Sequence, residues 1–430
     1  MSEPKKSIRL DISALRVSRD FRLIFSAGVI SNIGSMMTYV AMPFQIKELT
    51  NSYLWVGAVG LVETIPLIIF GLYGGVLADA FDRKKLLLFS ELAAMLVSIG
   101  LLLNVLTGFN SPILVLIFAM LFAATDGIFR PAADATTPQV VPYLKLPSAA
   151  ALNSLRHQTA SIAGPMIGGI ILATGGIAIA YFIDALTFVL SLILLFRIRS
   201  VKPLDGVEKP SLNRIKEGVK YALSRKDLLG STLVDTSAML FAFPYALFPF
   251  VADDLGGPWA LGILYASIPA GALIATLTSG WSNYVTRHGR IVAFAACGWG
   301  LGIVLFGLVH SLLYAVIGLM IAGFFDQISA LFRSLIWNQS IPDHLRGRLA
   351  SIEMLSYSIG PQLGQVRGAL FARAGGLEFS LISGGLLTIA TTIVVSGFLK
   401  DFYKYDVKTN IHAKKLKEFR EKNEKNDHNI

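Results

Sequence analysis

The sequence predicts an all-α membrane protein in which twelve transmembrane helices form two related six-helix bundles. Three observations predict this fold class: long apolar segments, basic residues gathered in alternate loops, and a repeat between the two halves. The 430 residues are 54% hydrophobic and 15% charged, with a mean hydropathy of +0.61. Soluble domains carry more charge, whereas a helix that crosses a bilayer needs about 20 apolar residues.

Apolar segments of that length recur between residues 21 and 399. In the first half we expect spans at about Phe21–Lys47, Leu54–Ala78, Leu86–Thr107, Pro112–Asp134, Pro147–Thr174 and Ile177–Ile198. In the second half we expect them at about Leu228–Ala252, Trp259–Tyr284, Ile291–Val309, Leu312–Arg333, Leu345–Ala372 and Leu377–Leu399. The predicted domains are therefore an N-terminal arm (1–20), a first bundle (21–198), a linker (199–227), a second bundle (228–399) and a tail (400–430).

The net charge of +10 is distributed as in a polytopic membrane protein. Basic residues fall in the arm, the loops after even-numbered spans, the linker and the tail, with Lys47 and Arg373 as the main exceptions. This is the positive-inside pattern, so we expect both termini to be cytoplasmic in the cell membrane, with the lipid bilayer and not nucleic acid as the partner. The first apolar run is too long for a cleavable signal and should remain as a span.

The linker and the tail carry most of the remaining polar sequence. Helical apolar spacing over Leu212–Ala222 predicts an amphipathic helix at the membrane surface. The tail Lys400–Ile430 is rich in Lys, Glu and Asn, so we expect it to be solvated. The lone Cys297 excludes an intrachain disulfide and a cysteine-based metal site, and we expect no metal and no cofactor.

Internal duplication is visible as residues that recur at a constant separation. Asp126 and Asp326, Gln139 and Gln339, and Pro142 and Pro342 are each 200 residues apart. A Gly-Pro-x-x-Gly motif follows each set, beginning at Gly164 in the fifth span and at Gly360 in the eleventh. Two halves in the same orientation follow, with a substrate site where the halves meet near the bilayer midplane.

The loop between the second and third spans carries a signature. Gly75-x-x-x-Asp79-x-x-x-Arg83-Lys84 resembles the corresponding loop of the major facilitator superfamily, although Asp82 replaces the usual glycine before the arginine. The resemblance implies that Asp79 lies beside the N-terminus of the eleventh helix and latches the halves in the outward-facing state. Arg83 could pair with Asp126 or Asp134, and the alternative is a simple positive-inside anchor.

Two further motifs favour an exporter. Gly164-Pro165-x-x-Gly168-Gly169 resembles the fifth-helix signature of the exporting branch, in which proline removes a backbone donor and bends the helix. The loops at 130–154 and 341–348 resemble the enterobactin-exporter and macrolide-efflux branch, and the resemblance extends over roughly Leu15–Leu399. Asp126 and Arg130, one turn apart, are either a structural ion pair or part of a gate.

Ionisable residues within the spans are candidates for proton coupling, because burying them is costly and they are seldom kept without a role. Glu63 and Asp235 have no obvious local partner, while Glu353 and Asp326 are comparable candidates. Aromatic, methionine and amide side chains could line a cavity for an amphipathic solute. The candidates for this cavity are Asn32, Met36, Tyr39, Phe243, Tyr245, Tyr265 and Tyr357.

Taken together, the residues and the resemblance imply a secondary transporter that works by alternating access. We expect a monomer that exports a hydrophobic or amphipathic small molecule, such as a drug or siderophore, in exchange for protons. The alternatives are a proton-coupled importer of a polar solute and a non-transporting membrane scaffold or receptor. An enzyme is not expected, because the sequence has no Gly-x-x-x-x-Gly-Lys-Ser/Thr phosphate loop and no Ser/His/Asp arrangement stands out.

Overall fold

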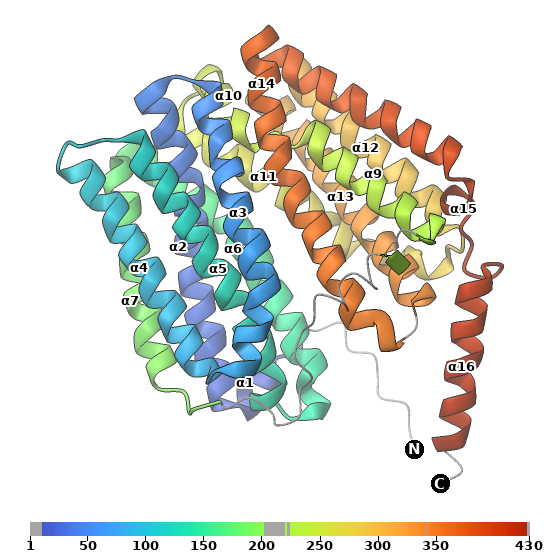
Figure 1. Cartoon of the computed structure of the whole chain (residues 1–430). Coiled ribbons are helices and arrows are strands. Elements are labelled where there is room, and N and C mark those ends of the chain that lie inside the picture. Colours follow the sequence, from blue (N-terminus) through green and yellow to red (C-terminus); the bar gives the residue numbers. More distant parts are fainter. Residues whose placement is uncertain (1–10, 202–219, 222–223, 342, 428–430) are drawn as a thin grey trace. The chain divides into compact units, whose positions relative to one another are not determined.

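The computed structural model describes residues 11–201, 220–221, 224–341 and 343–427, with the side chains of 71–72, 74–76, 78–79, 283, 343–357 and 420–427 left out (Figure 1). The described residues form helices joined by short loops and contain no strand. The all-α prediction is therefore confirmed. The chain divides into two compact units, 1–45 with 65–209 and 46–64 with 210–430.

The described residues of the first unit form seven α-helices and one 3-10 turn. They are α1 (Ser13–Val17), α2 (Arg19–Thr50), α3 (Tyr53–Ala80), α4 (Arg83–Leu106), α5 (Pro112–Val140), η1 (Tyr143–Lys145), α6 (Leu146–Thr174) and α7 (Gly176–Phe196). Residues 46–64, which span the end of α2 and the start of α3, group with the second unit. Proline at the first position of α5, behind the Ser111 cap, starts that helix because proline is tolerated where no amide bond is needed.

The second unit also contains the remaining helices. They are α9 (Lys226–Ala242), η2 (Tyr245–Leu247), α10 (Phe248–Asp254), α11 (Pro258–Leu277), η3 (Ser279–Tyr284), α12 (His288–Leu308), α13 (Leu312–Ser340), α14 (Asp343–Phe398), α15 (Lys400–Tyr403) and α16 (Ile411–Asp427). The long α14 is broken at Gly376, whose φ of 91° and ψ of 174° are not helical. This break falls between the predicted eleventh and twelfth spans.

Among the described residues, ten helices are long and apolar enough to cross a membrane. Two features separate this number from the twelve predicted spans. The stretch Ser358–Phe398 of α14 counts as one helix although it contains the break at Gly376, and α6 is not among the ten. Its residues 146–174 nevertheless form a continuous helix at the place of the predicted fifth span.

The predicted seventh span is interrupted. Helix α9 ends at Ala242, Phe243 has an extended ψ of 114°, and the short η2 and α10 follow. Proline occurs at 244 and 249, and proline removes the backbone donor that a continuous helix would use. Two adjoining helices therefore replace the single predicted one.

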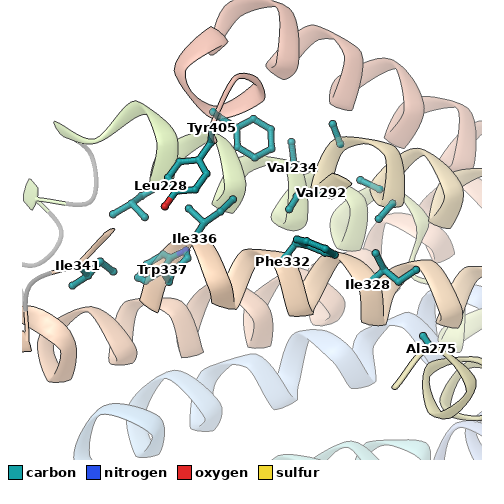
Figure 2. Packing of buried hydrophobic residues seen from close by; sticks show 14 residues of the cluster. Leu228, Val234, Ala275, Val292, Ile328, Phe332, Ile336, Trp337, Ile341 and Tyr405 are labelled. Atoms are coloured by element: carbon teal, nitrogen blue, oxygen red, sulfur yellow. The ribbon is translucent and has the colours of Figure 1, made fainter. Parts of the chain in front are cut away.

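The tail was expected to be solvated and partly helical or disordered, and two aromatic residues at its start are buried instead. Phe402 and Tyr405 are 0% and 1% exposed and join a core that includes Leu228, Phe332 and Trp337 (Figure 2). The prediction failed because the charged residues of the tail dominate its composition, while the two aromatic rings supply the contact. The predicted linker helix at Leu212–Ala222 lies outside the described residues, apart from Lys220 and Tyr221.

Two glycines allow the tail to approach the bundle. A Cβ atom at Gly230 of α9 or Gly289 of α12 would collide with Phe402. The amide of Val407 then donates to the carbonyl of Thr286 over 3.0 Å, and the hydroxyl of Thr286 donates to Asp406 over 3.1 Å. Residues 402–407 thus form a strap, named here the tail strap, across one end of the second unit.

Candidate functional site

The loop between α3 and α4 is organised by Asp82. Its carboxylate accepts hydrogen bonds from the backbone amides of Lys84 at 2.9 Å and Val201 at 3.3 Å, and from the hydroxyl of Ser200. Asp82 is thus the N-cap of α4, a position where aspartate stabilises a helix. Burial raises the pKa of Asp82, but the bonds from Ser200 and the two amides lower it more, so the pKa lies below its ordinary value. Asp82, which replaces the glycine usual in the signature, thus adds hydrogen bonds to residues 200 and 201.

Arg83 lies in the same loop but is buried, with 4% of its surface exposed. Its Nη1 donates to the carbonyl of Ala135 on α5 over 2.9 Å, and its backbone amide donates to the carbonyl of Val201. Ala135 is the neighbour of the predicted partner Asp134. The side chain of Asp79 and the surroundings of Gly75 are not described, so the predicted latch stays a prediction.

The predicted gate residues lie on the exposed surface of α5. Asp126, Arg130 and Asp134 are each exposed. Spaced one turn apart, they form a charged row on α5 that ends next to Ala135, the acceptor for Arg83. The structure therefore brings this row and Arg83 to one end of α5, and its function in gating stays a prediction.

The glycine motif of α6 packs tightly against α2. Gly164, Pro165, Gly168 and Gly169 are all buried. A Cβ at Gly164 would collide with Met36, and one at Gly168 would lie 3.2 Å from the Cα of Met37. The motif therefore serves close helix packing. Met36, predicted to line a cavity, touches this motif, while Asn32 and Tyr39 on the same helix are half-buried.

A buried carboxylate, Asp184 of α7, joins three helices of the first unit. Its Oδ2 accepts hydrogen bonds from the hydroxyl of Thr38 on α2 at 2.5 Å and from that of Ser98 on α4 at 2.7 Å. All three side chains are 0% exposed. Hydroxyls can also accept a bond, so this arrangement can hold the carboxyl group in either protonation state.

A second carboxylate, Glu91 of α4, was absent from the predicted sites. It is 3% exposed and accepts a bond from the hydroxyl of Ser31 on α2 at 3.0 Å. Arg156 of α6 approaches the same region, because a Cβ at Gly28 of α2 would collide with its guanidinium group. A sequence signal existed, since Glu91 interrupts the apolar run of the third span six residues after Lys85. Glu91 and Asp184 are thus two buried carboxyl groups within the helices of the first unit.

The second unit holds its buried aspartate in another way. Asp235 of α9 is 3% exposed, and its Oδ2 lies 2.6 Å from Nη1 of Arg333 on α13. The sequence provided no local partner for Asp235, and the structure provides one from a helix distant in the chain. Asp326, two turns before Arg333 on α13, is half-buried. Two predicted coupling residues therefore share one arginine-centred region.

Three of the predicted cavity residues form one aromatic cluster at the interruption of the seventh span. Ring centroids of Phe243 and Tyr245 are 4.4 Å apart, and those of Tyr245 and Tyr265 are 4.9 Å apart. Phe248 joins at 5.0 Å from Tyr265. The Tyr265 hydroxyl donates to the carbonyl of Tyr245 over 3.1 Å and so satisfies a backbone group that the broken helix leaves over.

Glu63 has its described contact with α14. The Nε2 of Gln362 donates to Glu63 Oε2 over 3.2 Å, and Glu63 is 6% exposed. Gly57 and Gly60 face α14 so closely that a Cβ would clash with Ala369 or with the Gln362 carbonyl. The remaining predicted residues, Glu353 and Tyr357, have side chains outside the described set. No cluster of His, Cys, Asp or Glu suited to a metal occurs in the part of the chain that the structure describes.

Comparison with known proteins adds sequence and fold relationships. A family model described as transmembrane secretion effector matches residues 12–424. Proteins named enterobactin exporter EntS are 30% identical over 399 residues, covering 92% of this chain and 92% of the relative, in Shigella boydii serotype 18 and in Escherichia coli O1:K1.

Solved structures agree in fold. The nucleoside transporter NupG gives a TM-score of 0.67 at 12% identity, covering 90% of this chain and all of the other. A POT family transporter in complex with 5-aminolevulinic acid gives 0.70 at 12% identity, covering 90% and 97%. At these identities the likeness concerns the fold alone.

Proposed function

This chain belongs to the transmembrane secretion effector family of the major facilitator superfamily, and from this premise we propose that it exports a siderophore-like, amphipathic small molecule in exchange for protons. The observation that carries the proposal is the 30% identity to enterobactin exporters over 92% of both chains. A match over nearly the full length includes both halves of the transport machinery.

The proposed proton carrier is Asp235. Its carboxylate is buried against the Arg333 guanidinium at 2.6 Å, so a proton on Asp235 would remove the negative charge that Arg333 faces. A buried cation without its counter-ion is costly. Protonation at this position therefore alters the energetics of two helices, α9 and α13, at once. Glu63, Asp326 and Glu353 remain alternative carriers.

The proposed substrate contact is the aromatic cluster of Phe243, Tyr245 and Tyr265. Aromatic rings offer a large apolar surface, and the tyrosine hydroxyls add polar groups at its edge. Pockets for small molecules combine these two properties. A siderophore-like solute with aromatic and hydroxyl groups would match both, whereas a small polar nutrient would match only the hydroxyls. The importer alternative is disfavoured on this ground.

The proposed orientation follows the distribution of basic residues. The arm, the α3–α4 loop and the tail carry lysine and arginine clusters, so we place both termini and these loops in the cytoplasm. The two halves would then alternate between an inward-open and an outward-open state around a central site. We propose a monomer as the transporting species.

Transport by the purified full chain in phosphatidylcholine–phosphatidylglycerol vesicles tests this function, with enterobactin as the probe. We expect enterobactin to move against an imposed proton gradient and the gradient to collapse in a substrate-dependent manner. Asp235→Asn should abolish the proton dependence, while Asp401→Asn, an exposed carboxylate outside the bundle, should leave it intact. A scaffold or receptor would show no substrate-dependent proton movement in any variant, and an importer would move solute in the direction of the protons.

A further inference from the structure

A cavity of about 510 Å³ lies at one end of the first unit. It is lined by Val17, Ser18, Arg19, Asp20, Val140, Pro142, Arg197, Ile198 and Arg199. These residues come from the α1–α2 junction, the end of α5 and the end of α7. The volume is within the range of about 300–1,000 Å³ that small-molecule sites occupy. None of the transport residues discussed above lines this cavity.

The cavity is strongly basic. Arg199 pairs with the buried Asp20 at 2.7 Å between Nε and Oδ2. The side chains of Arg19 and Arg197 have no hydrogen-bond or ion-pair partner in the described part of the chain, and both residues are exposed. Three arginines against one aspartate leave the lining with a surplus of two positive charges. Guanidinium groups match the geometry of phosphate oxygens, so an oxyanion such as a phosphate suits this lining.

The helix that ends at the cavity presents a lipid-facing stripe. Its large apolar side chains are exposed at intervals of four and three residues, which is one face of a helix. They are Phe182, Leu186, Val189, Ile193 and Phe196, with 56%, 46%, 39%, 48% and 72% of their surface exposed. Arg197 follows directly after Phe196, the last residue of α7. Arg197 thus stands at the end of the apolar stripe, where its side chain can extend toward a lipid headgroup.

From this continuity we propose that the cavity binds the phosphate of an anionic phospholipid from the inner leaflet. The acyl chains would lie along the α7 stripe, and Arg19 and Arg197 would hold the phosphodiester. The inner leaflet follows from the membrane orientation proposed above. Basic pockets at the cytoplasmic ends of transmembrane helices are suited to such headgroups. The α7 stripe favours a lipid over a free phosphate, which has no apolar part to use it.

Lipid binding by the purified, delipidated full chain tests this assignment. Affinity is measured by native mass spectrometry with phosphatidylglycerol, with phosphatidylcholine and with inorganic phosphate alone. We expect Arg197→Gln to weaken phosphatidylglycerol binding about fivefold and the Arg19→Gln, Arg197→Gln pair about 25-fold, from the usual contribution of a basic residue near an anionic membrane. Arg16→Gln is the matched control, because Arg16 is exposed on the same arm but does not line the cavity.

Three results would overturn the proposal. Equal weakening in Arg16→Gln and Arg197→Gln would mean that diffuse surface charge attracts the lipid. If phosphatidylcholine bound as tightly as phosphatidylglycerol, the arginines would not select the anionic headgroup. Inorganic phosphate that displaces phosphatidylglycerol at equal concentration would assign the cavity to a free anion. Unchanged unfolding temperatures of all variants in phosphatidylcholine are required for each comparison. Loss of lipid selectivity would leave the enterobactin flux test unaffected, so the two proposals fail independently.

Discussion

The two units hold their carboxylates with different partners. In the first unit, hydroxyl and amide groups hold Asp184, Glu91 and Asp82. In the second unit, arginines hold Asp235 and Asp227, the latter in a two-bond pair with Arg225 at 3.0 and 2.7 Å. Two carboxylates depart from this contrast. Asp20 of the first unit forms an ion pair with Arg199 at the end of the bundle, and Glu63, which groups with the second unit, accepts a hydrogen bond from the Gln362 amide.

This difference has a physical consequence for proton transfer. A hydroxyl can reverse its role from donor to acceptor, so a carboxyl group that it holds can take up a proton without leaving a charge behind. An arginine cannot, because it stays positive at all relevant pH values. Protonation of Asp184 therefore leaves no paired cation behind, whereas protonation of Asp235 removes the counter-ion of Arg333.

The largest expected effect is for Asp235→Asn. The substitution leaves the Arg333 guanidinium buried without a counter-ion, so the free energy of unfolding should fall by about 3–5 kcal/mol. Denaturant unfolding of the purified chain in mixed micelles measures it. The double variant Asp235→Asn, Arg333→Gln should recover most of the loss, because no charge is stranded. A single variant as stable as the wild type would contradict the ion-pair description.

A smaller effect is expected for Asp184→Asn. The hydroxyls of Thr38 and Ser98 can still donate to the amide oxygen, so only the charge assistance of two hydrogen bonds is lost, about 2 kcal/mol. The same unfolding measurement applies. If Asp184→Asn destabilised the chain as much as Asp235→Asn, the contrast between the two units would fail.

The smallest effect is expected for Asp82→Gly, which restores the residue usual in the superfamily signature. Loss of the cap and of the bonds from Ser200 and Val201 should cost about 1 kcal/mol. The pKa of Asp82 is lower in the folded chain than its ordinary value of 3.8. The ionised carboxylate therefore stabilises the fold at pH values above 3.8, and this stabilisation is lost as the pH falls through the folded pKa. Wild type and variant should therefore converge in stability at acidic pH. A constant difference across that range would assign the effect to backbone flexibility instead.

Much of the fold could be predicted because hydropathy and charge act over contiguous residues. The apolar spans, the all-helical fold and the family all follow from local patterns. The partner of Asp235 could not be predicted, because Arg333 is on another helix and no spacing rule relates the two. The interruption at Phe243 had a signal in the prolines at 244 and 249, and tertiary packing of the aromatic rings decides where the helix ends.

Three of the seven predicted cavity residues lie together in the structure, and their contact with a substrate stays a prediction. Phe243, Tyr245 and Tyr265 were grouped as cavity residues and lie in one cluster. Glu91 was not predicted, because a position soon after a basic cluster is typical of the end of a loop. Its side chain is nevertheless buried. The tail was predicted as solvated because two buried rings are outweighed by many charges in any composition average.

The tail strap connects α16 to the membrane-embedded part of the second unit through a short segment. Phe402 is fixed against Gly230 of α9 and Gly289 of α12, and only a few residues separate Tyr405 from the start of α16 at Ile411. A force applied to α16 would therefore reach the ends of two transmembrane helices directly, as tension on a short tether does. Movement of α9 and α12 would in turn displace α16.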